Sequence, residues 1–435
     1  MRYLVLGAGL TGLTAAFHLP RDSTIVLEAE NTAGGLCRSV VRGDYRFDRT
    51  GHFLHFRNER ARAFVDNLLP EKLATHVRNS AIRIFGNDMP QPFQSHLAWL
   101  PDAVRRECLV DFVKACAARI DEPISESKNL SQWFHRSFGK GITRHFLDPQ
   151  NRKTYCCEMT ELDALGVIPY VAQPSIEQVI DGALFREAMA PTGYNSEFLY
   201  PKDGGIQILP DAIVAQLENV HYSRRVVAVD SIQRKVRCVD GTEYEYENIV
   251  STLPLDKLIE ITRGLRSSDY TTASGLRSVD VLDIRLGIAS KASVPYHWLY
   301  LPEAEFPFTR AVIPSNVSST AAPRGHCAIH LEFNCRSGER IDAEEMIRKA
   351  ILCVREIGIV AADCQVEFAA AERIQSAYVV QDHHRREVLP DLLGALSATG
   401  IYSVGRYGGW GYGGMESAIL DGIGVAEKLL AQGET

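Results

Sequence analysis

The chain lacks several features that would assign a protein of 435 residues to a class at once. It has no uninterrupted run of about 18 apolar residues, so we expect no membrane-spanning helix, and its first residues do not resemble a signal peptide. Its ten cysteines include no CxxC pair and no zinc-type spacing, so we expect no metal site and reduced thiols in a cytoplasmic protein. The formal net charge of -7 does not favour nucleic acid as a partner.

A strand followed by spaced glycines opens the chain. The apolar run Tyr3–Leu6 leads directly into a GxGxxG pattern, and a helix is predicted to follow at residues 13–19. In this pattern Gly7 permits a tight turn, Gly9 lets the backbone approach a pyrophosphate, and Gly12 lets the helix pack closely on the strand. The N-terminus of the helix then offers amides and a positive dipole end to phosphates. The unit predicts a Rossmann-type dinucleotide site.

A second strand and a second pair of glycines extend this unit. The predicted strand Thr24–Leu27 ends at Glu28, about 20 residues beyond the glycines, where an acid binds the ribose hydroxyls of adenosine. Residues 34–39 resemble the GG motif that follows the Rossmann unit in the amine oxidase, protoporphyrinogen oxidase and UDP-galactopyranose mutase group of flavoproteins. The resemblance implies FAD rather than NAD as the cofactor, with Gly35 and Arg38 at its diphosphate.

Glycines also crowd the far end of the chain. A short strand is predicted at residues 401–404, and six glycines follow within residues 405–414, before a helix predicted at residues 415–430. Glycines allow close backbone approach to a ligand, and the aromatic side chains among them indicate a pocket. In the flavoprotein group this segment completes the FAD site, so the resemblance assigns four more residues to the cofactor: Gly405, Arg406, Met415 and Glu416.

Between the two ends the pattern predicts two further parts. Residues 58–69 and 101–119 have helix-like spacing, whereas residues 281–288 and 327–333 alternate like strands. We expect an α/β protein with a Rossmann-type FAD-binding domain, a helical insertion and an antiparallel-sheet substrate domain. The predicted boundaries are 1–57 with 200–270 and 395–435 for the discontinuous FAD-binding domain, 58–199 for a mainly helical domain, and 271–394 for the substrate domain.

Several segments resemble UDP-galactopyranose mutases more than amine oxidases. Residues 51–55 are similar to a mutase stretch in which a histidine lies against the isoalloxazine ring, which places His52 at the cofactor. Residues 149–155 are similar to the mutase PYNxKxW segment, with Tyr155 in place of tryptophan. The strongest similarity runs through residues 297–303, 307–310 and 314–316, which match a mutase block whose tyrosine and arginine hold the sugar-nucleotide diphosphate.

The resemblance also implies roles in catalysis and substrate binding. His55 is expected to tune the flavin N5 or move a proton, and Arg310 to bind a diphosphate through paired charge-assisted hydrogen bonds. The residues assigned to catalysis are His55, Arg310, Tyr300 and Tyr412, and those assigned to the substrate are Asn151, Trp298, Tyr300, Arg310, Tyr378 and Tyr412. One position departs from the mutase pattern. A second mutase arginine is replaced by Ile168 here, and the loss of such a charged hydrogen bond costs about 1.5 to 3 kcal/mol.

The activity implied by this resemblance is that of an isomerase, a nucleotide-sugar pyranose/furanose mutase. In that reaction N5 of reduced FAD attacks the anomeric carbon while the nucleoside diphosphate leaves, and NAD(P)H is a candidate reductant. Two alternatives stay open. An oxidoreductase of the amine oxidase or protoporphyrinogen oxidase type would use the same FAD motifs with an aromatic cage, to which Trp410 and Tyr412 could contribute. A protein that binds flavin or nucleotide sugar without catalysis would account for Ile168.

Overall fold

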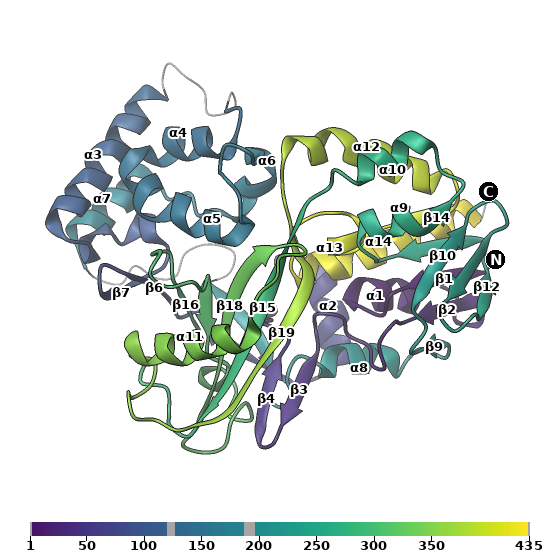
Figure 1. Ribbon diagram of the computed structural model, residues 1–435, viewed down its shortest axis with the longest axis horizontal. Helices are drawn as coiled ribbons and strands as arrows, with labels where there is room; N and C mark the ends of the chain where they lie inside the picture. The colour runs from purple at the N-terminus through teal and green to yellow at the C-terminus, as the bar shows by residue number, and fades with distance from the viewer. Residues whose placement is uncertain (1, 120–126, 187–195, 434–435) are drawn as a thin grey trace.

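Three groups of secondary structure make up the protein (Figure 1). The structure, a computed structural model, describes residues 2–119, 127–186 and 196–433. In Figure 1 a helical group lies at the upper left, a twisted sheet at the lower centre, and a parallel sheet with its helices at the right, where both chain ends lie. Within the described residues, no helix combines the length and the apolar character that crossing a membrane requires.

A five-stranded sheet forms the dinucleotide-binding unit. Its strand order is β20-β13-β1-β2-β9, and all of its pairs are parallel. The strands are β20 (Ile401–Ser403), β13 (Asn248–Ser251), β1 (Tyr3–Leu6), β2 (Thr24–Leu27) and β9 (Val220–His221). All four residues of the central strand β1 are buried, as expected for a parallel sheet covered on both faces. The predicted Rossmann-type unit is therefore confirmed.

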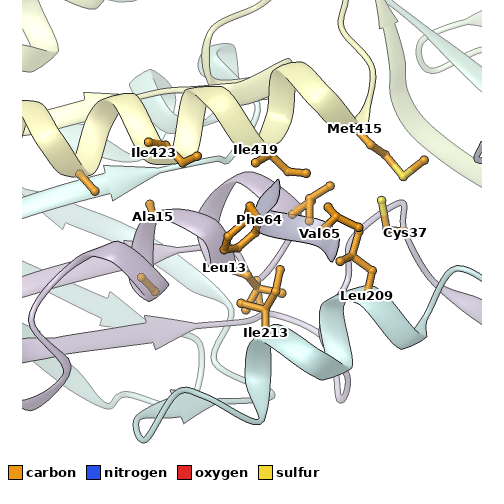
Figure 2. Packing of buried hydrophobic residues seen from close by; sticks show 14 of the residues in the cluster. Leu13, Ala15, Cys37, Phe64, Val65, Leu209, Ile213, Met415, Ile419 and Ile423 are labelled. Carbon is orange, nitrogen blue, oxygen red and sulfur yellow. The ribbon is translucent and has the colours of Figure 1, made fainter. Parts of the chain in front are cut away.

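Helices cover one face of this sheet through a shared apolar core (Figure 2). They are α1 (Leu10–His18), α2 (Glu59–Leu68), α8 (Ile208–Val214) and α14 (Met415–Gly433). Figure 2 shows Leu13 of α1 beside Phe64 of α2 and Ile213 of α8. Ile419 and Ile423 are four residues apart, so they lie on one face of α14 and dock it on this core. Burial of each such side chain contributes about 1.5 to 3 kcal/mol, which ties the last helix to the first.

Helix α1 begins three residues earlier than the sequence pattern predicts, at Leu10 instead of residue 13. Gly9 has extended backbone angles (φ -73°, ψ 173°) and is the N-cap, so the chain enters the helix directly after it. Gly12 consequently lies inside the helix, where a Cβ atom would meet the carbonyl oxygen of Gly7 at 2.1 Å. This close approach is the helix-strand packing for which the motif requires glycine.

The opposite face of the parallel sheet packs against further helices and a small sheet. The helices are α9 (Leu255–Ile261), α10 (Ser267–Ala273) and α12 (His383–Ser397). The small sheet has the order β12-β11-β10-β14, with strands β12 (Glu243–Glu245), β11 (Lys235–Cys238), β10 (Val226–Asp230) and β14 (Thr262–Arg263). Their apolar side chains form one core with Leu4 and Leu6 of β1. The single turn α13 (Gly405–Gly408) lies in the glycine-rich segment after β20.

A seven-stranded sheet with the order β19-β15-β18-β17-β16-β6-β7 forms the second large layer. Its pairs are antiparallel except for the parallel pair β6 and β16. The strands are β19 (Val366–Val379), β15 (Ser278–Ile288), β18 (Cys327–Arg336), β17 (Arg310–Val312), β16 (Trp298–Tyr300), β6 (Ser80–Ile84) and β7 (Asn87–Pro90). Helix α11 (Ala343–Glu356) packs on this sheet. The predicted antiparallel sheet is confirmed.

The helical group contains α3 (Asp102–Ala118), α4 (Leu130–Ile142), α5 (Asp148–Tyr155), α6 (Ala164–Val167) and α7 (Ile176–Leu184). Aromatic side chains such as Phe112, Trp133 and Phe134 fill its core.

Two small sheets pair β3 (Ser39–Arg42) with β4 (Tyr45–Asp48), and β5 (Leu73–Val77) with β8 (Glu197–Pro201). The range 58–199 thus includes strands as well as helices, and β6 and β7 belong to the seven-stranded sheet. The domain boundaries stay a prediction.

Candidate active site

A cavity of about 1660 Å³ is lined by residues of the parallel sheet, the seven-stranded sheet and the helical group. Pockets for drug-sized ligands measure about 300 to 1,000 Å³, so this volume can hold a dinucleotide together with a substrate. The predicted site residues that line it are Gly7, Gly9, Glu28, Gly35, His52, His55, Trp298, Tyr300, Arg310, Tyr378, Gly405, Arg406, Tyr412, Met415 and Glu416. Gly12, Arg38 and Asn151 do not line it.

Glycines form a backbone cradle in this cavity. Gly7 and Gly35 have positive φ values of 101° and 58°, which side chains of L-residues rarely allow. A Cβ atom on Gly35 would lie 3.1 Å from Cα of Gly9, so the two glycine loops are in close contact. A Cβ atom on Gly9 would have no neighbour within 4 Å. Open space therefore lies beside the backbone where the motif predicts the dinucleotide diphosphate, and the residues fit FAD.

Glu28 ends β2 beside the cradle. Its Oε2 accepts a hydrogen bond from the backbone N of Ala8 at 2.8 Å, and its Oε1 accepts one from the backbone N of Glu30 at 2.9 Å. The residue is 9% exposed and lines the cavity. The two amides fix the orientation of the carboxylate, and each oxygen keeps a lone pair for a ribose hydroxyl. This arrangement suits the adenosine role predicted from the sequence.

Arg49, instead of Arg38, carries positive charge into the cradle. Arg38 pairs with Glu30 at 3.1 Å and lies outside the cavity lining. Arg49 lines the cavity, and its Nη1 donates to the carbonyl oxygen of Gly35 at 3.3 Å. Its Nε donates to Glu372 of β19 at 2.6 Å, so a carboxylate of the other large sheet fixes its orientation. We therefore expect Arg49 to bind the cofactor diphosphate that the sequence assigned to Arg38.

Replacing Arg49 with alanine should weaken FAD binding about 10- to 100-fold, because a charged hydrogen bond contributes about 1.5 to 3 kcal/mol. Arg38→Ala is the matched control, and it should change the FAD dissociation constant by at most about fivefold, since Arg38 lies outside the cavity lining and an ion pair with an exposed carboxylate such as that of Glu30 contributes at most about 1 kcal/mol. Quenching of flavin fluorescence during titration of the apoprotein measures both constants. A larger loss in Arg38→Ala than in Arg49→Ala would restore the sequence-based assignment.

Two partly buried histidines follow the β3–β4 hairpin. Burial lowers the pKa of His52 to about 4, and the positive charges of Arg406 and Arg310 add to this effect. Burial also lowers the pKa of His55, whose Nδ1 donates to the carbonyl oxygen of Glu197 at 3.0 Å. Since a carbonyl can only accept, Nδ1 carries the proton and Nε2 carries the lone pair. Both rings are neutral at pH 7, so His55 is in the form that can accept a proton.

Arg310 is held by a buried carboxylate. Its Nε and Nη2 donate to Oε2 and Oε1 of Glu332 at 2.7 and 2.8 Å. The pairing of β17 with β18 places the two residues opposite each other, and Glu332 is 1% exposed. Burial alone would lower the pKa of Arg310, but the charge of Glu332 raises it well above its usual value. Nη1 makes no hydrogen bond to the described residues, so it can bind a ligand in the cavity.

Tyr300 lies opposite Arg310 on the neighbouring strand β16. Burial alone would raise the pKa of its phenol, but the positive charges of Arg78 and Arg310 outweigh burial and lower the pKa. A phenol between two guanidiniums is a strong hydrogen-bond donor, because its developing negative charge is stabilised. Tyr300 and Arg310 together therefore offer donors to an anionic ligand.

Lys153 of α5 fixes the loop that connects Tyr300 with Arg310. Its Nζ donates to the carbonyl oxygens of three loop residues at 2.6, 2.6 and 2.5 Å: Leu301, Glu303 and Phe306. Burial lowers the pKa of Lys153 to about 8, which leaves most of the ammonium charged at pH 7. The lysine of the segment that resembles PYNxKxW thus positions the strands on either side of the loop.

Arg406 holds two tyrosines of the cavity wall. Its guanidinium carbon lies 5.1 Å from the ring centroid of Tyr378 and 4.9 Å from that of Tyr412. The two rings stack with centroids 5.9 Å apart and an interplanar angle of 10°. Nε donates to the carbonyl oxygen of Ala377 at 3.1 Å, and Nη1 donates to that of Gly413 at 3.0 Å. Arg406 was predicted at the cofactor, and its contacts show that it also orders this aromatic wall.

Glu416 and Asn151 make contacts that the sequence did not predict. Oε1 of Glu416 accepts hydrogen bonds from the backbone N atoms of Arg57 and Asn58 at 2.5 and 2.6 Å, so it joins α14 to the start of α2. Glu416 still lines the cavity. Nδ2 of Asn151 donates to the carbonyl oxygen of Leu147 at 2.7 Å, which stabilises the turn before α5. Asn151 lies outside the cavity lining, so its assignment to the substrate has no support in this geometry.

Two further residues lie away from the cavity. Trp410 is fully buried in the core behind the parallel sheet, so it cannot form an aromatic cage with Tyr412 at the cavity. Ile168 does not line the cavity either, whereas the next five residues, 169–173, do. None of these five is an arginine. The arginine that the mutase resemblance implies near Ile168 is therefore absent from the whole segment of this wall.

Sequence analysis missed several residues that line the cavity or support its lining, among them Arg49, Arg78, Gln91, His96 and Glu332. The first four belong to no recognisable motif, and the tertiary fold brings them to the cavity from segments that are far apart in the sequence. For Glu332 the sequence does contain an indication of its role. It is a carboxylate within the apolar run of residues 327–333, and a buried acid requires a cationic partner.

The free energy of unfolding should decrease as the pH falls from about 6.5 to about 4, in part because of His297. Burial lowers the pKa of His297 to about 4, whereas its usual value is 6.5. Between these values the unfolded chain binds a proton that the folded protein does not, which costs up to about 1.4 kcal/mol per pH unit. His297→Gln should flatten this slope in urea unfolding at about pH 7 and about pH 5. If the wild type and His297→Gln lost the same free energy of unfolding between the two pH values, His297 would have an ordinary pKa in the folded protein.

Several known proteins resemble this chain in structure or in sequence. A crystal structure of reduced UDP-galactopyranose mutase matches with a TM-score of 0.93 at 25% identity, covering 99% of this chain and 96% of that chain. Protoporphyrinogen oxidase 2 of Arabidopsis thaliana is 22% identical over 298 residues, which are 60% of this chain and 58% of the plant enzyme. Coproporphyrinogen III oxidase of Mycobacterium tuberculosis is 23% identical over 312 residues, which are 68% of each chain.

These comparisons confirm the resemblance and the fold class predicted from the sequence. The match to the mutase structure extends over nearly the whole chain, and the glycine cradle has the open space that an FAD-dependent enzyme requires. The family model of flavin containing amine oxidoreductases matches residues 10–430. The chain therefore belongs to the flavin containing amine oxidoreductase family.

Proposed function

We propose that the protein is an FAD-dependent mutase that interconverts the pyranose and furanose forms of a nucleotide-diphosphate sugar. The observation that carries the proposal is the pair of Arg310 and Glu332 beside Tyr300, next to the cavity that also contains the glycine cradle. A guanidinium that is fixed by two hydrogen bonds and keeps one nitrogen for a ligand suits a phosphate oxygen. The likeness to a UDP-galactopyranose mutase structure supports the same function.

In this reaction the residues of the cavity bind the substrate and stabilise its leaving group. Arg310 and Tyr300 donate to the diphosphate and stabilise the negative charge that develops there as the bond to the anomeric carbon breaks. Tyr412, ordered by Arg406, adds a neutral donor on the aromatic wall. His55 accepts a proton through Nε2 when a sugar hydroxyl closes the new ring. When bound, reduced FAD supplies a nucleophilic N5, with NAD(P)H as the proposed source of reduction.

An oxidoreductase of the protoporphyrinogen oxidase type is the second candidate. The observation that favours it is the set of relatives found by sequence, which are named as protoporphyrinogen and coproporphyrinogen oxidases. Such a reaction needs the FAD cradle but has no leaving group for the guanidinium that Glu332 orients, which would bind only a carboxylate of the substrate. Trp410 is fully buried in the core, so it cannot supply a wall of the aromatic cage that an amine oxidase would use. The mutase reaction gives a role to more of the residues that line the cavity.

The test compares reduced with oxidised holoenzyme. The FAD-loaded protein is reduced anaerobically with dithionite or with NADPH and incubated with a panel of nucleotide-diphosphate hexopyranoses, and furanose formation is followed by chromatography. Conversion by the reduced enzyme alone is the expected result. Hydrogen peroxide from porphyrinogens or amines, without any furanose, would assign the oxidase instead. Nucleotide binding without turnover in either assay would assign a binding protein.

A further inference from the structure

A second arginine, Arg78, reaches the cavity from the connection between β5 and β6. Its guanidinium carbon lies 4.6 Å from the ring centroid of Trp298. Nε donates to Oγ of Ser80 at 3.0 Å, and Nη2 donates to Oε1 of Gln91. All four residues line the cavity. A ring face and two side-chain oxygens thus fix the guanidinium in one orientation at the cavity wall.

The strand order places Arg78 and Arg310 on opposite sides of Tyr300. β16 lies between β6 and β17, with Trp298 beside Ser80 on one side and Tyr300 opposite Arg310 on the other. Tyr300 pairs with Ile82 of β6, whereas Arg78 comes two residues before Ser80. Its guanidinium lies over Trp298, two residues before Tyr300 on β16, and so approaches Tyr300 from the β6 side. The positive charges of both arginines act on the same phenol and lower its pKa against the effect of burial. An anion at Tyr300 is therefore within reach of two guanidiniums.

A diphosphate needs more positive charge than Arg310 alone supplies. Glu332 accepts two hydrogen bonds from Arg310 and cancels its charge, so this pair offers a directed donor with little net charge. A nucleotide diphosphate carries negative charge on two phosphoryl groups, and guanidiniums bind such groups through charge-assisted hydrogen bonds. The wall formed by residues 169–173 supplies no arginine. The cavity has Arg78 on the side opposite to Arg310.

We propose that Arg78 is the second guanidinium that binds the diphosphate of the nucleotide sugar, in place of an arginine near Ile168. The inference rests on the proposed function, because it requires a diphosphate in the cavity. It defines the substrate as one whose anionic group spans Tyr300, with Arg310 on one side and Arg78 on the other. Trp298 and Gln91 hold Arg78 ready for this contact before the substrate binds.

The experiment separates the charge of Arg78 from its packing. FAD-loaded protein is titrated with UDP, GDP and ADP by calorimetry, and the nucleotide that binds is carried through the variants. Arg78→Met keeps an apolar stem against Trp298 without the charge, and its dissociation constant should rise about 10- to 100-fold. Arg78→Lys keeps the charge without the planar fork and should recover part of the affinity. The matched control is Arg83→Met, because Arg83 lies on β6 but pairs with Asp88 at 2.9 Å outside the cavity lining.

Each outcome decides one question. Loss of affinity in Arg78→Met, partial recovery in Arg78→Lys and wild-type binding in Arg83→Met are the expected results. Wild-type affinity in Arg78→Met would overturn the inference and leave Arg78 as a packing partner of Trp298, while the proposed function would stand. Failure of the wild-type holoenzyme to bind any of the nucleoside diphosphates would instead remove the proposed function itself. The flavin absorbance spectrum of each variant reports whether the FAD site is intact.

Discussion

The Arg310→Ala variant should have a kcat/KM for the nucleotide sugar that is lower by about 1000-fold or more, while it retains FAD. Removal of one donor that stabilises a developing negative charge costs about 100- to 1000-fold. A second effect adds to this, because Glu332 is 1% exposed and would be left as an unpaired carboxylate beside the anionic substrate. The glycine cradle does not contain Arg310, so the FAD content should stay the same. Initial rates of furanose formation by the reduced enzyme measure the effect.

A double variant separates the two effects of losing Arg310. In Arg310→Ala with Glu332→Gln the buried group is neutral, so the repulsion disappears although the guanidinium is still absent. About tenfold of the lost activity should return, equal to about 1.4 kcal/mol. Activity of Arg310→Ala within about tenfold of the wild type would contradict its assignment to the leaving group, and the mutase proposal would lose the observation that carries it.

The cofactor side of the site could be predicted from the sequence because its residues are neighbours along the chain. The strand Tyr3–Leu6, the three glycines and Glu28 all fall within one strand-helix-strand unit, and the spacing of such a unit is fixed by local geometry. The start of α1 was predicted three residues late, since hydrophobic periodicity does not detect an N-cap glycine. Arg38 follows the glycines closely in the sequence, yet in the structure it pairs with Glu30 outside the cavity lining, whereas Arg49 lines the cavity. Adjacency in sequence does not say which way a side chain points.

The carboxylates that orient the arginines of the site could not be predicted from the sequence, because their positions depend on how distant strands pair. In the seven-stranded sheet Arg310 lies opposite Glu332, Glu332 opposite Asp283, and Asp283 opposite Glu372. Glu372 in turn accepts a hydrogen bond from Arg49, a residue 323 positions away in the sequence. No local pattern contains this row of charged residues. It requires the register of four strands, which the sequence alone does not provide.

The row of charged residues on the seven-stranded sheet orients arginines in both the substrate side and the cofactor side of the site. Glu332 orients Arg310, which we propose to bind the substrate diphosphate, and Glu372 orients Arg49, which we expect to bind the cofactor diphosphate. Burial alone would raise the pKa of Glu372, but the positive charges of Arg285 and Arg49 lower it, so the carboxylate stays charged. Carboxylates of one rigid sheet therefore fix both arginines, and the distance between the two anion sites is set by strand register.

The Gly9→Val variant should fold normally but lose FAD, with a dissociation constant raised by more than about 1000-fold. The backbone angles of Gly9 (φ -73°, ψ 173°) are allowed for any L-residue, and its Cβ atom would have no neighbour within 4 Å. The free energy of unfolding of the apoprotein should therefore change by less than about 1 kcal/mol. The open space at Gly9 is the part of the cradle where the diphosphate is expected, and a branched side chain would occupy it.

Gly12→Val is the matched variant, because it replaces a glycine of the same motif but should affect folding instead of the space for FAD. Its Cβ atom would lie 2.1 Å from the carbonyl oxygen of Gly7, which is backbone and cannot move aside, so folding itself should be destabilised by about 3 kcal/mol or more. Gly424→Ala on α14, where a Cβ atom also has no neighbour within 4 Å, should behave as wild type in both assays. Thermal unfolding of the apoprotein and the ratio of flavin to protein absorbance measure the two properties separately. If Gly9→Val retained FAD, the diphosphate would pass elsewhere, and the close contact between Gly9 and Gly35 would serve the fold alone.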